Sequence, residues 1–214
     1  MIKKNDFIEV SYTGKTKEEN FVFDTTEETV AKEAGIYNPE GKYGTLIICV
    51  GQHHLLPGLD KFIEGKDLGN FTVELPPEEA FGKKNAKLIQ LIPTSKFIQQ
   101  RIQPQVGLQV TIDGHLGVIK TVTGGRTLVD FNHPLSGKNV LYEISIKKKI
   151  TDQKEQALSL LKMRLGLTEV TLDITEHTLV IRSKHNIPEP IQEQMSKEIK
   201  ELTPFQEVTW GSKA

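Results

Sequence analysis

The stretch VGQHHLLPGLD, residues 50–60, joins an apolar strand to a short helix. Residues 46–50 form a continuous apolar run, which is typical of a buried strand, and Gly51 ends it. A proline then opens a helix over residues 57–64, where its missing N–H breaks no intrahelical bond. Three apolar side chains of this helix fall at i, i+3 and i+4 and face one side: Leu59, Phe62 and Ile63.

Composition limits the classes of protein that fit. Of the 214 residues, 37% are hydrophobic and 26% charged, the balance of a globular protein with one to three compact units. The 27 basic and 28 acidic residues nearly cancel, so no basic surplus indicates nucleic acid as a partner. No run approaches the roughly 18 apolar residues that span a bilayer, no apolar leader follows Met1, and the single Cys49 forms no intrachain disulfide. We therefore expect a cytoplasmic protein without a membrane partner.

Period-two alternation predicts strands around the helix. Residues 7–12 alternate apolar and polar side chains, which predicts a half-buried strand that ends at Gly14. Three more runs predict strands of the same sheet: residues 21–23, 71–75 and 140–146. Residues 1–83 and 131–150 are therefore expected to form one interrupted α+β domain.

The two remaining segments have other patterns. Residues 84–130 hold alternating runs separated by glycine turns, which predicts a small all-β domain inserted into the first. Residues 151–214 predict an αββαβ unit whose first helix is capped by Thr151 or Asp152. At about 60 residues, this unit has a marginal core alone and gains from docking or dimerisation.

Five ordered blocks of the sequence resemble the FKBP-type prolyl isomerases. They are VSYTG (10–14), FVFDTT (21–26), VGQHHLLPGLD (50–60), PEEAFG (77–82) and LYEI (141–144). The insertion that follows the fourth block is similar to the SlyD subgroup, whose insert-in-flap domain binds unfolded chains, and the C-terminal unit is similar to that of long archaeal members. The resemblance implies a twisted antiparallel sheet around a short helix and peptidyl-prolyl cis/trans isomerase activity, with no cofactor and no metal.

The resemblance also implies a proline pocket. Its residues in this sequence are Tyr12, Phe23, Asp24, Leu46, Ile48, Leu55, Leu56, Leu59, Phe81 and Tyr142. In the family, the position of Leu56 supplies a backbone N–H to the substrate carbonyl. Leu59 stands where many members have tryptophan, and Glu79 where tyrosine is common. These departures leave isomerase activity in place and argue against tight binding of macrolide inhibitors.

The inserted domain offers apolar residues for substrate contact. They are Leu88, Ile89, Leu91, Ile92, Phe97 and Ile98. Two interpretations stay open, because the same residues serve either as a surface that grips extended segments or as the core of the insert.

The expected partners are unfolded or nascent polypeptides that contain proline, and a homodimer through residues 151–214. The competing interpretation is a holdase that binds unfolded chains without useful isomerase activity, and a third is an assembly protein that dimerises through its C-terminal unit. His53 and His54 are adjacent, so their side chains diverge, and we interpret them as loop residues rather than metal ligands. Trp210 is either a core residue or an interface anchor.

Overall fold

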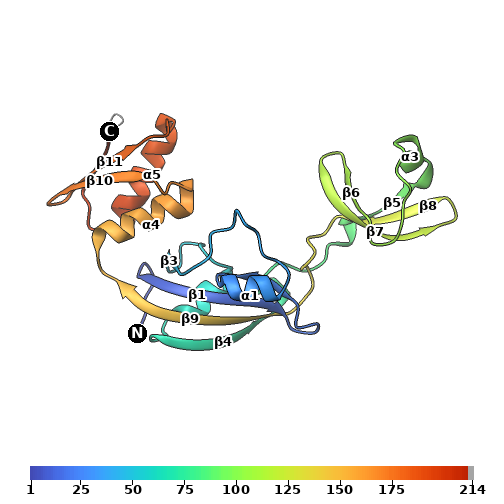
Figure 1. Ribbon diagram of the computed structural model, residues 1–214, viewed down its shortest axis with the longest axis horizontal. Helices are drawn as coiled ribbons and strands as arrows, with labels where there is room; N and C mark the ends of the chain where they lie inside the picture. The colour runs from blue at the N-terminus through green and yellow to red at the C-terminus, as the bar shows by residue number, and fades with distance from the viewer. Residues whose placement is uncertain (212–214) are drawn as a thin grey trace. The chain divides into compact units, whose positions relative to one another are not determined.

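The computed structural model of the chain describes residues 1–211 (Figure 1). The chain divides into two compact units, Met1–Leu75 with the residues from Val140 onward, and Pro76–Asn139. The described residues form three sheets and five α-helices, so the predicted α+β class is confirmed.

The first sheet has five strands, all antiparallel to their neighbours. The order is β2-β1-β9-β4, with β3 paired to β1. The strands are β1 (Phe7–Thr16), β2 (Val22–Thr25), β3 (Leu46–Cys49), β4 (Gly69–Leu75) and β9 (Val140–Ile150). The predicted end of β1 at Gly14 is wrong, because Gly14 pairs with Asp24 on one side and Tyr142 on the other, inside the ladder.

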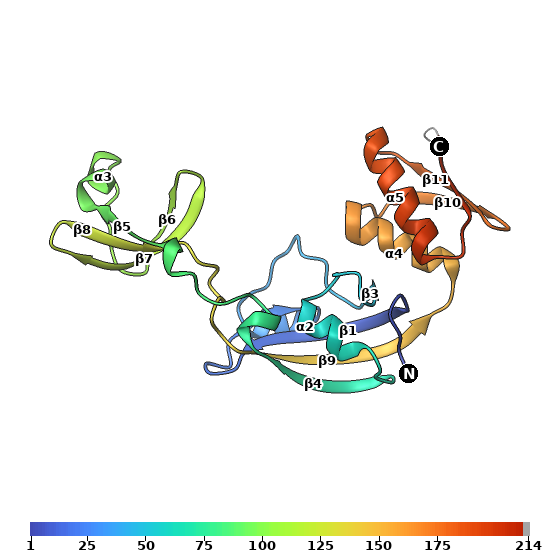
Figure 2. The ribbon, with the colours of Figure 1, turned by 180° about the vertical axis from the view of Figure 1, so that it is seen from behind.

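The two short helices of this part lie on opposite faces of the sheet. Helix α1 (Glu28–Glu33) lies in front of the strands in Figure 1, and helix α2 (Pro57–Ile63) lies in front of them when the molecule is seen from behind in Figure 2. Alternation sends Ile8, Val10 and Ile144 to the α2 side, where they form a core with Ile63. This face carries the aromatic residues described below.

The chain continues from β9 into two helices and three strands. They are α4 (Gln153–Leu165), β10 (Val170–Thr175), β11 (Thr178–Ser183), α5 (Glu189–Leu202) and β12 (Glu207–Gly211). Their sheet has the order β10-β11-β12, with β10 and β11 antiparallel and β12 parallel to β11. Asp152 caps α4, since its Oδ1 accepts the Glu155 N–H at 2.7 Å, and Gly166 ends the helix at φ 67°.

The C-terminal elements share a core with the first sheet. Phe7 lies opposite both Cys49 and Ile150 in the strand register, so these three side chains face the side away from Ile8. There they join one apolar cluster with residues of α4 such as Leu160. Burial raises the pKa of the Cys49 thiol to about 12, so it stays protonated and unreactive.

Trp210 belongs to this core. Its ring packs against the cluster, and its Nε1–H donates to Ser196 Oγ at 2.9 Å and to the Gln192 carbonyl at 3.2 Å. Of the two interpretations of Trp210, the structure favours the core residue.

The second unit is a four-stranded antiparallel sheet with one helix. Its strands, in the spatial order β5-β8-β7-β6, are β5 (Ile89–Pro93), β8 (Arg126–Asp130), β7 (His115–Thr123) and β6 (Gln109–Ile112). Short 3-10 turns at Pro77–Glu79 and Ala86–Leu88 precede it. The expectation of an all-β insert is wrong, because helix α3 (Thr94–Gln99) buries Phe97 in the core of this unit. Six residues are too few for a periodic signal.

No helix within residues 1–211 is long and apolar enough to cross a membrane.

Candidate functional site

Three aromatic side chains meet on the α2 face of the first sheet. Tyr142 of β9 is the central ring, with its centroid 5.8 Å from that of Tyr12 and 5.8 Å from that of Phe23. The Phe23 ring meets Tyr142 edge-on at 77°, a favourable geometry for aromatic pairs. Tyr142 is only 3% exposed, and Tyr12 and Phe23 are partly buried. Three strands thus contribute to one apolar cluster.

A β-bulge allows Phe23 and Asp24 to reach the same cluster. The register between β1 and β2 passes from Gly14↔Asp24 to Lys15↔Val22, which leaves Phe23 as an extra residue. Consecutive residues of a regular strand point to opposite faces, whereas a bulge re-aims one of them. Phe23 therefore contacts Tyr142 while its neighbour Asp24 contacts Tyr12.

Gly14 leaves the space that this cluster occupies. A Cβ atom at Gly14 would lie 2.9 Å from Phe23 Cε2 and 2.9 Å from Tyr142 Cε1. Real Cβ atoms do not approach so closely, so any side chain at this position would displace one of the two rings. Neither the bulge nor this close approach follows from period-two alternation alone.

A hydrogen bond joins Asp24 to Tyr12. The Tyr12 hydroxyl donates to Asp24 Oδ2 at 3.1 Å. Protein atoms around the Asp24 carboxyl desolvate it and raise its pKa above the ordinary range, although bonds from Tyr12 and the Thr25 amide oppose the shift. Burial and the nearby carboxylate also raise the pKa of Tyr12 and of Tyr142. The rings of Tyr12 and Tyr142 thus lie in surroundings poor in water, while the exposed Asp24 marks the rim of the cluster.

Threonines after Asp24 fix the position of Tyr12. Thr26 Oγ1 accepts the Tyr12 N–H at 2.9 Å, and the Thr26 N–H donates to the Tyr12 carbonyl at 3.0 Å. The hydroxyls of Thr13 and Thr25 lie 2.8 Å apart and buried. These positioning roles were not predicted, although Thr25 and Thr26 directly follow the predicted acid.

The aliphatic residues of the predicted pocket lie on the same sheet face, on α2 or in the loop that precedes α2. Ile48 is part of the core there, and Leu46, Leu55 and Tyr12 pack against it. Leu56 stands before the first turn of α2, and Leu59 in that turn is 1% exposed.

The loop that carries Leu55 and Leu56 is held by Asp60, a role that the sequence did not reveal. Asp60 is 6% exposed, and its carboxylate accepts the Gly51 N–H at 3.3 Å and the His53 N–H at 2.9 Å. These bonds hold the turn, in which His53 has a φ of 56°.

The histidine pair diverges. His53 is exposed, whereas the His54 side chain turns inward and its Nδ1 accepts the Cys49 N–H at 3.0 Å. His54 Nε2 is buried without a partner, and burial and the nearby Arg164 lower the pKa of this ring. Within residues 1–211, no group of three or more His, Cys, Asp or Glu side chains could hold a metal ion.

Phe81 belongs to the second unit. Its ring stacks on His133, with the centroids 5.0 Å apart and the planes 3° from parallel. Ser136 Oγ donates to the Phe81 carbonyl at 3.1 Å, which ties the two ends of this unit together. Its membership of the proline pocket stays a prediction.

The six predicted contact residues of the insert divide into two groups. Phe97 is buried in the core, and Ile92 packs against it. The other four reach the surface: Leu88 (39% exposed), Ile89 (36%), Leu91 (54%) and Ile98 (64%).

One face of the insert sheet is apolar and open. Core residues Val129 and Ile119 pair in register and point to the α3 side, so their strand neighbours point outward. Leu116 of β7, which was not among the predicted contact residues, is 59% exposed. With Val118 and Leu128, which are partly exposed, it continues the apolar surface of β5 across the sheet. We call this the outer face of the insert, and its apolar residues are Ile89, Leu91, Leu116, Val118 and Leu128.

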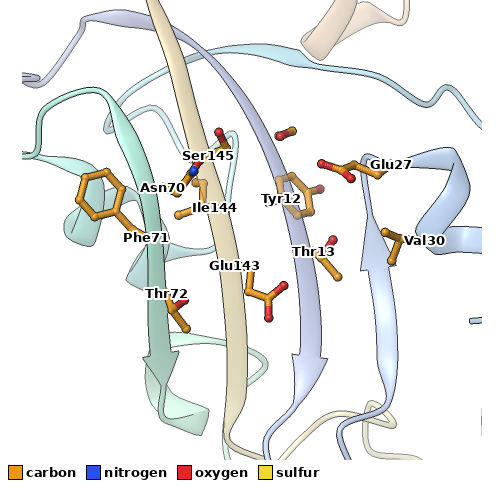
Figure 3. Close-up of a pocket in the computed structure, with 11 residues that line it drawn as sticks. Tyr12, Thr13, Glu27, Val30, Asn70, Phe71, Thr72, Glu143, Ile144 and Ser145 are labelled. Carbon is orange, nitrogen blue, oxygen red and sulfur yellow. The ribbon is translucent and has the colours of Figure 1, made fainter.

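The first sheet also has a cavity of about 330 Å³, which is lined by residues of β1, β4 and β9 and by the α1 region (Figure 3). Residues paired across the strands turn polar side chains to this cavity, while Glu27 and Val30 line it from the α1 region. The polar side chains of the strands are Ser11, Thr13, Asn70, Thr72, Glu143 and Ser145. Tyr12, Phe71 and Ile144 complete the lining, so polar and apolar groups both border this cavity.

Comparison with known proteins agrees with this geometry. Residues 1–103 match the family profile described as FKBP-type peptidyl-prolyl cis-trans isomerase, and residues 90–135 match the profile described as FKBP26, IF domain. The short-type peptidyl-prolyl cis-trans isomerase of Methanocaldococcus jannaschii is 35% identical over 148 residues, which cover 69% of this chain and 93% of that protein. The chain belongs to the FKBP-type peptidyl-prolyl cis-trans isomerases.

Two bacterial FKBP-type relatives are also similar. The SlyD isomerase of Pasteurella multocida is 30% identical over 150 residues, or 68% of this chain and 67% of the relative. A probable FKBP-type 16 kDa isomerase of Pseudomonas fluorescens is 35% identical over 103 residues, or 45% and 67% of the two chains. The FKBP-type assignment thus covers most of the first sheet and reaches the insert.

Proposed function

We propose that this FKBP-type isomerase accelerates cis/trans isomerisation of X-Pro bonds in unfolded polypeptides, and that the site is the aromatic cluster around Tyr142. The observation that carries this proposal is the contact of Tyr12, Phe23, Asp24 and Tyr142 on one sheet face. The apolar walls of the site are Leu46, Ile48, Leu55, Leu56 and Leu59, with Phe81 as a further member. No cofactor and no metal takes part.

The chemistry asked of such a site is modest. Resonance holds a peptide C–N bond planar, and its rotation barrier is about 18–20 kcal/mol. For X-Pro, the two isomers differ by only about 0.5–1 kcal/mol, so both are populated and their exchange limits folding. No covalent bond has to break.

A water-poor aromatic surface favours the transition state over the ground state. When the imide twists, it loses resonance, its carbonyl becomes less polar, and hydration stabilises it less than the planar form. Moving the bond from water to the rings of Tyr12, Phe23 and Tyr142 therefore costs the twisted form less. Only such differential stabilisation raises a rate.

Asp24 orients the cluster rather than moving a proton. Its carboxylate accepts the Tyr12 hydroxyl bond, which fixes that ring beside Tyr142. Among the described residues, the Leu56 N–H is not part of a hydrogen bond, because it precedes the first turn of α2. We assign it to the carbonyl of the substrate residue before proline.

The inserted domain supplies affinity for unfolded chains. Its outer face exposes Leu91 and Leu116, and exposed apolar surface of this kind is typical of binding sites for extended segments. A chain held there stays near the catalytic site, which raises its effective concentration. We assign the catalytic domain to residues 1–83 and 131–150, the insert-in-flap chaperone domain to 84–130, and a C-terminal αββαβ domain to 151–214, in a protein of the cytoplasm.

Isomerisation of a proline tetrapeptide tests the catalytic half of the proposal. NMR exchange or a protease-coupled assay should show acceleration by the full chain, and Phe23→Ala should weaken it. Val30→Ala, an apolar truncation on helix α1 outside the Tyr142 cluster, should leave the rate unchanged. A chain without any acceleration would contradict the proposal.

The outer face of the insert also favours a second candidate, a holdase without useful catalysis. Such a protein would suppress aggregation of an unfolded client while leaving the tetrapeptide rate at its uncatalysed value. The same preparation tested in both assays separates the two functions.

The C-terminal domain is also proposed as the contact of a homodimer. Light scattering of the full chain over a range of concentrations tests this, and a monomer at every concentration would contradict it.

A further inference from the structure

Strand β3 is an edge of the first sheet. It pairs with β1 on one side, and within residues 1–211 no strand pairs with its other side. Open strand edges present backbone N–H and C=O groups to any extended chain that approaches.

One hydrogen bond shows which backbone N–H and C=O groups of β3 face its open edge. The Cys49 N–H donates to His54 Nδ1, so it points away from β1. Residues along an antiparallel strand alternate between turning toward and away from a given neighbour. Ile47 therefore turns its N–H and C=O to the open edge, where neither has a partner in the described part of the chain.

A cavity of about 310 Å³ lies along this edge. One wall is β3, with Leu46 and Ile47, and the other is helix α4, with Leu158 and Met163. A volume near 300 Å³ is at the lower end of the range for ligand sites, about 300–1,000 Å³. Leu46 and Met163 also pack against the apolar core of the α2 face.

Leu46 relates the cavity to the proposed catalytic site, because it contributes to both surroundings. This residue lines the cavity and packs on the same core as Tyr12 and Leu55. We propose that the cavity binds an extended apolar segment of the polypeptide substrate, which adds to the open edge of β3 as a further strand while the proline of that substrate occupies the Tyr142 cluster. The inference rests on the proposed function, because the segment belongs to the same substrate.

The charges around the cavity specify an uncharged segment. Lys148 is paired with Glu9 at 3.3 Å, and the remaining charged lining residues are one acid and one base of α4, Glu155 and Lys162. The rim therefore offers no surplus of either sign, and the apolar walls with the open Ile47 backbone supply the recognition.

Peptide length tests the inference. The full chain is assayed on a proline tetrapeptide and on two longer peptides with the same centre, one extended by alanine and leucine before it and one extended after it. One of the two extensions should raise kcat/KM roughly tenfold, the gain of about 1.4 kcal/mol expected from one or two net backbone bonds.

A pair of variants locates the gain. Leu158→Lys puts a charge into the cavity and should remove the gain while the tetrapeptide rate stays the same, since Leu158 lies outside the Tyr142 cluster. Leu165→Lys is the matched control, because Leu165 is a partly buried leucine of the same helix that is not among the cavity residues. If both variants lost the gain in kcat/KM to the same extent, the assignment of the extension to this cavity would be contradicted.

N-methylated peptides test the same inference with the unsubstituted protein. Methylation of the extension at alternate amides should remove the gain for one set of positions and spare the other, because only every second amide faces Ile47. A gain that is absent, or that survives every methylation, would overturn the inference alone. A tetrapeptide that is not isomerised would instead overturn the proposed function, and this inference with it.

Discussion

The aromatic cluster of the first sheet and the outer face of the insert are both apolar, but water reaches them differently. In the cluster, Tyr142 is 3% exposed and the rings of Tyr12 and Phe23 are partly buried, with only Asp24 exposed at the rim. On the outer face, Leu91 is 54% exposed and Leu116 59% exposed. An enclosed surface changes the relative energy of a bound planar and twisted imide, whereas an open one binds either form equally. The first arrangement is suited to catalysis and the second to capture.

Removal of the insert should give the largest effect and separates the two surfaces. Asn85 and Asn132 are joined by hydrogen bonds of 2.8 and 3.1 Å, so a short linker can replace residues 86–131. Refolding of a proline-limited protein should slow about 100-fold relative to the full chain, the lower end of tethering effects.

The tetrapeptide rate of that shortened chain should hardly change. As a milder version, the double variant Leu91→Glu and Leu116→Glu should weaken protein refolding in the same direction. Unchanged refolding in both variants would mean that the outer face does not bind the client.

The second largest effect is expected for substitutions of Tyr142 in the aromatic cluster. Tyr142→Ala removes the central ring, and loss of a buried aromatic side chain costs about 3–5 kcal/mol of unfolding free energy. The tetrapeptide rate should fall more than tenfold where the variant is folded, whereas Tyr142→Phe should keep it within about twofold, since the ring and not the hydroxyl carries the contact. Urea unfolding and the isomerisation assay measure the two effects, and a large loss in Tyr142→Phe would argue for a role of the hydroxyl.

A smaller loss is expected at the acid of the cluster. Asp24→Ala frees the Tyr12 ring and should slow tetrapeptide isomerisation about tenfold, below the 10²–10⁴-fold typical of a general acid or base. Isomerisation kinetics at one pH suffice to test it. Complete loss of activity would show that Asp24 transfers a proton.

The smallest effect is a pH dependence of stability. The pKa of Asp24 is raised in the folded chain, so the folded state favours the protonated acid, and this contribution is lost as pH rises through the folded pKa. Asp24→Asn keeps an acceptor for Tyr12 and removes the desolvated charge. The variant should therefore be slightly more stable than the parent at pH 7, and the difference should vanish below pH ~4, near the ordinary pKa of aspartate. Urea midpoints at several pH values measure it, and a variant less stable at pH 7 would contradict the sign.

Sequence patterns predicted the strands and helix of the first sheet well, because alternation and a proline-initiated helix are local signals. The predicted runs around Phe7, Leu46 and Val140 all lie in strands of one sheet. The bulge at Phe23 could not be predicted, since an extra residue in one strand depends on its partner. The sequence also could not predict that Leu91 is exposed while Phe97 is buried. An apolar run does not indicate which of its side chains other elements cover.

The apolar cluster that α4 shares with Phe7, Cys49 and Ile150 has a consequence for any shortened form of the chain. A chain that ended at Ile150, the last residue of β9, would expose the side chains of Phe7, Cys49 and Ile150 to solvent. Such a truncated protein would need polar residues at these positions to avoid aggregation. The length of the chain therefore determines whether position 7 can hold an apolar residue.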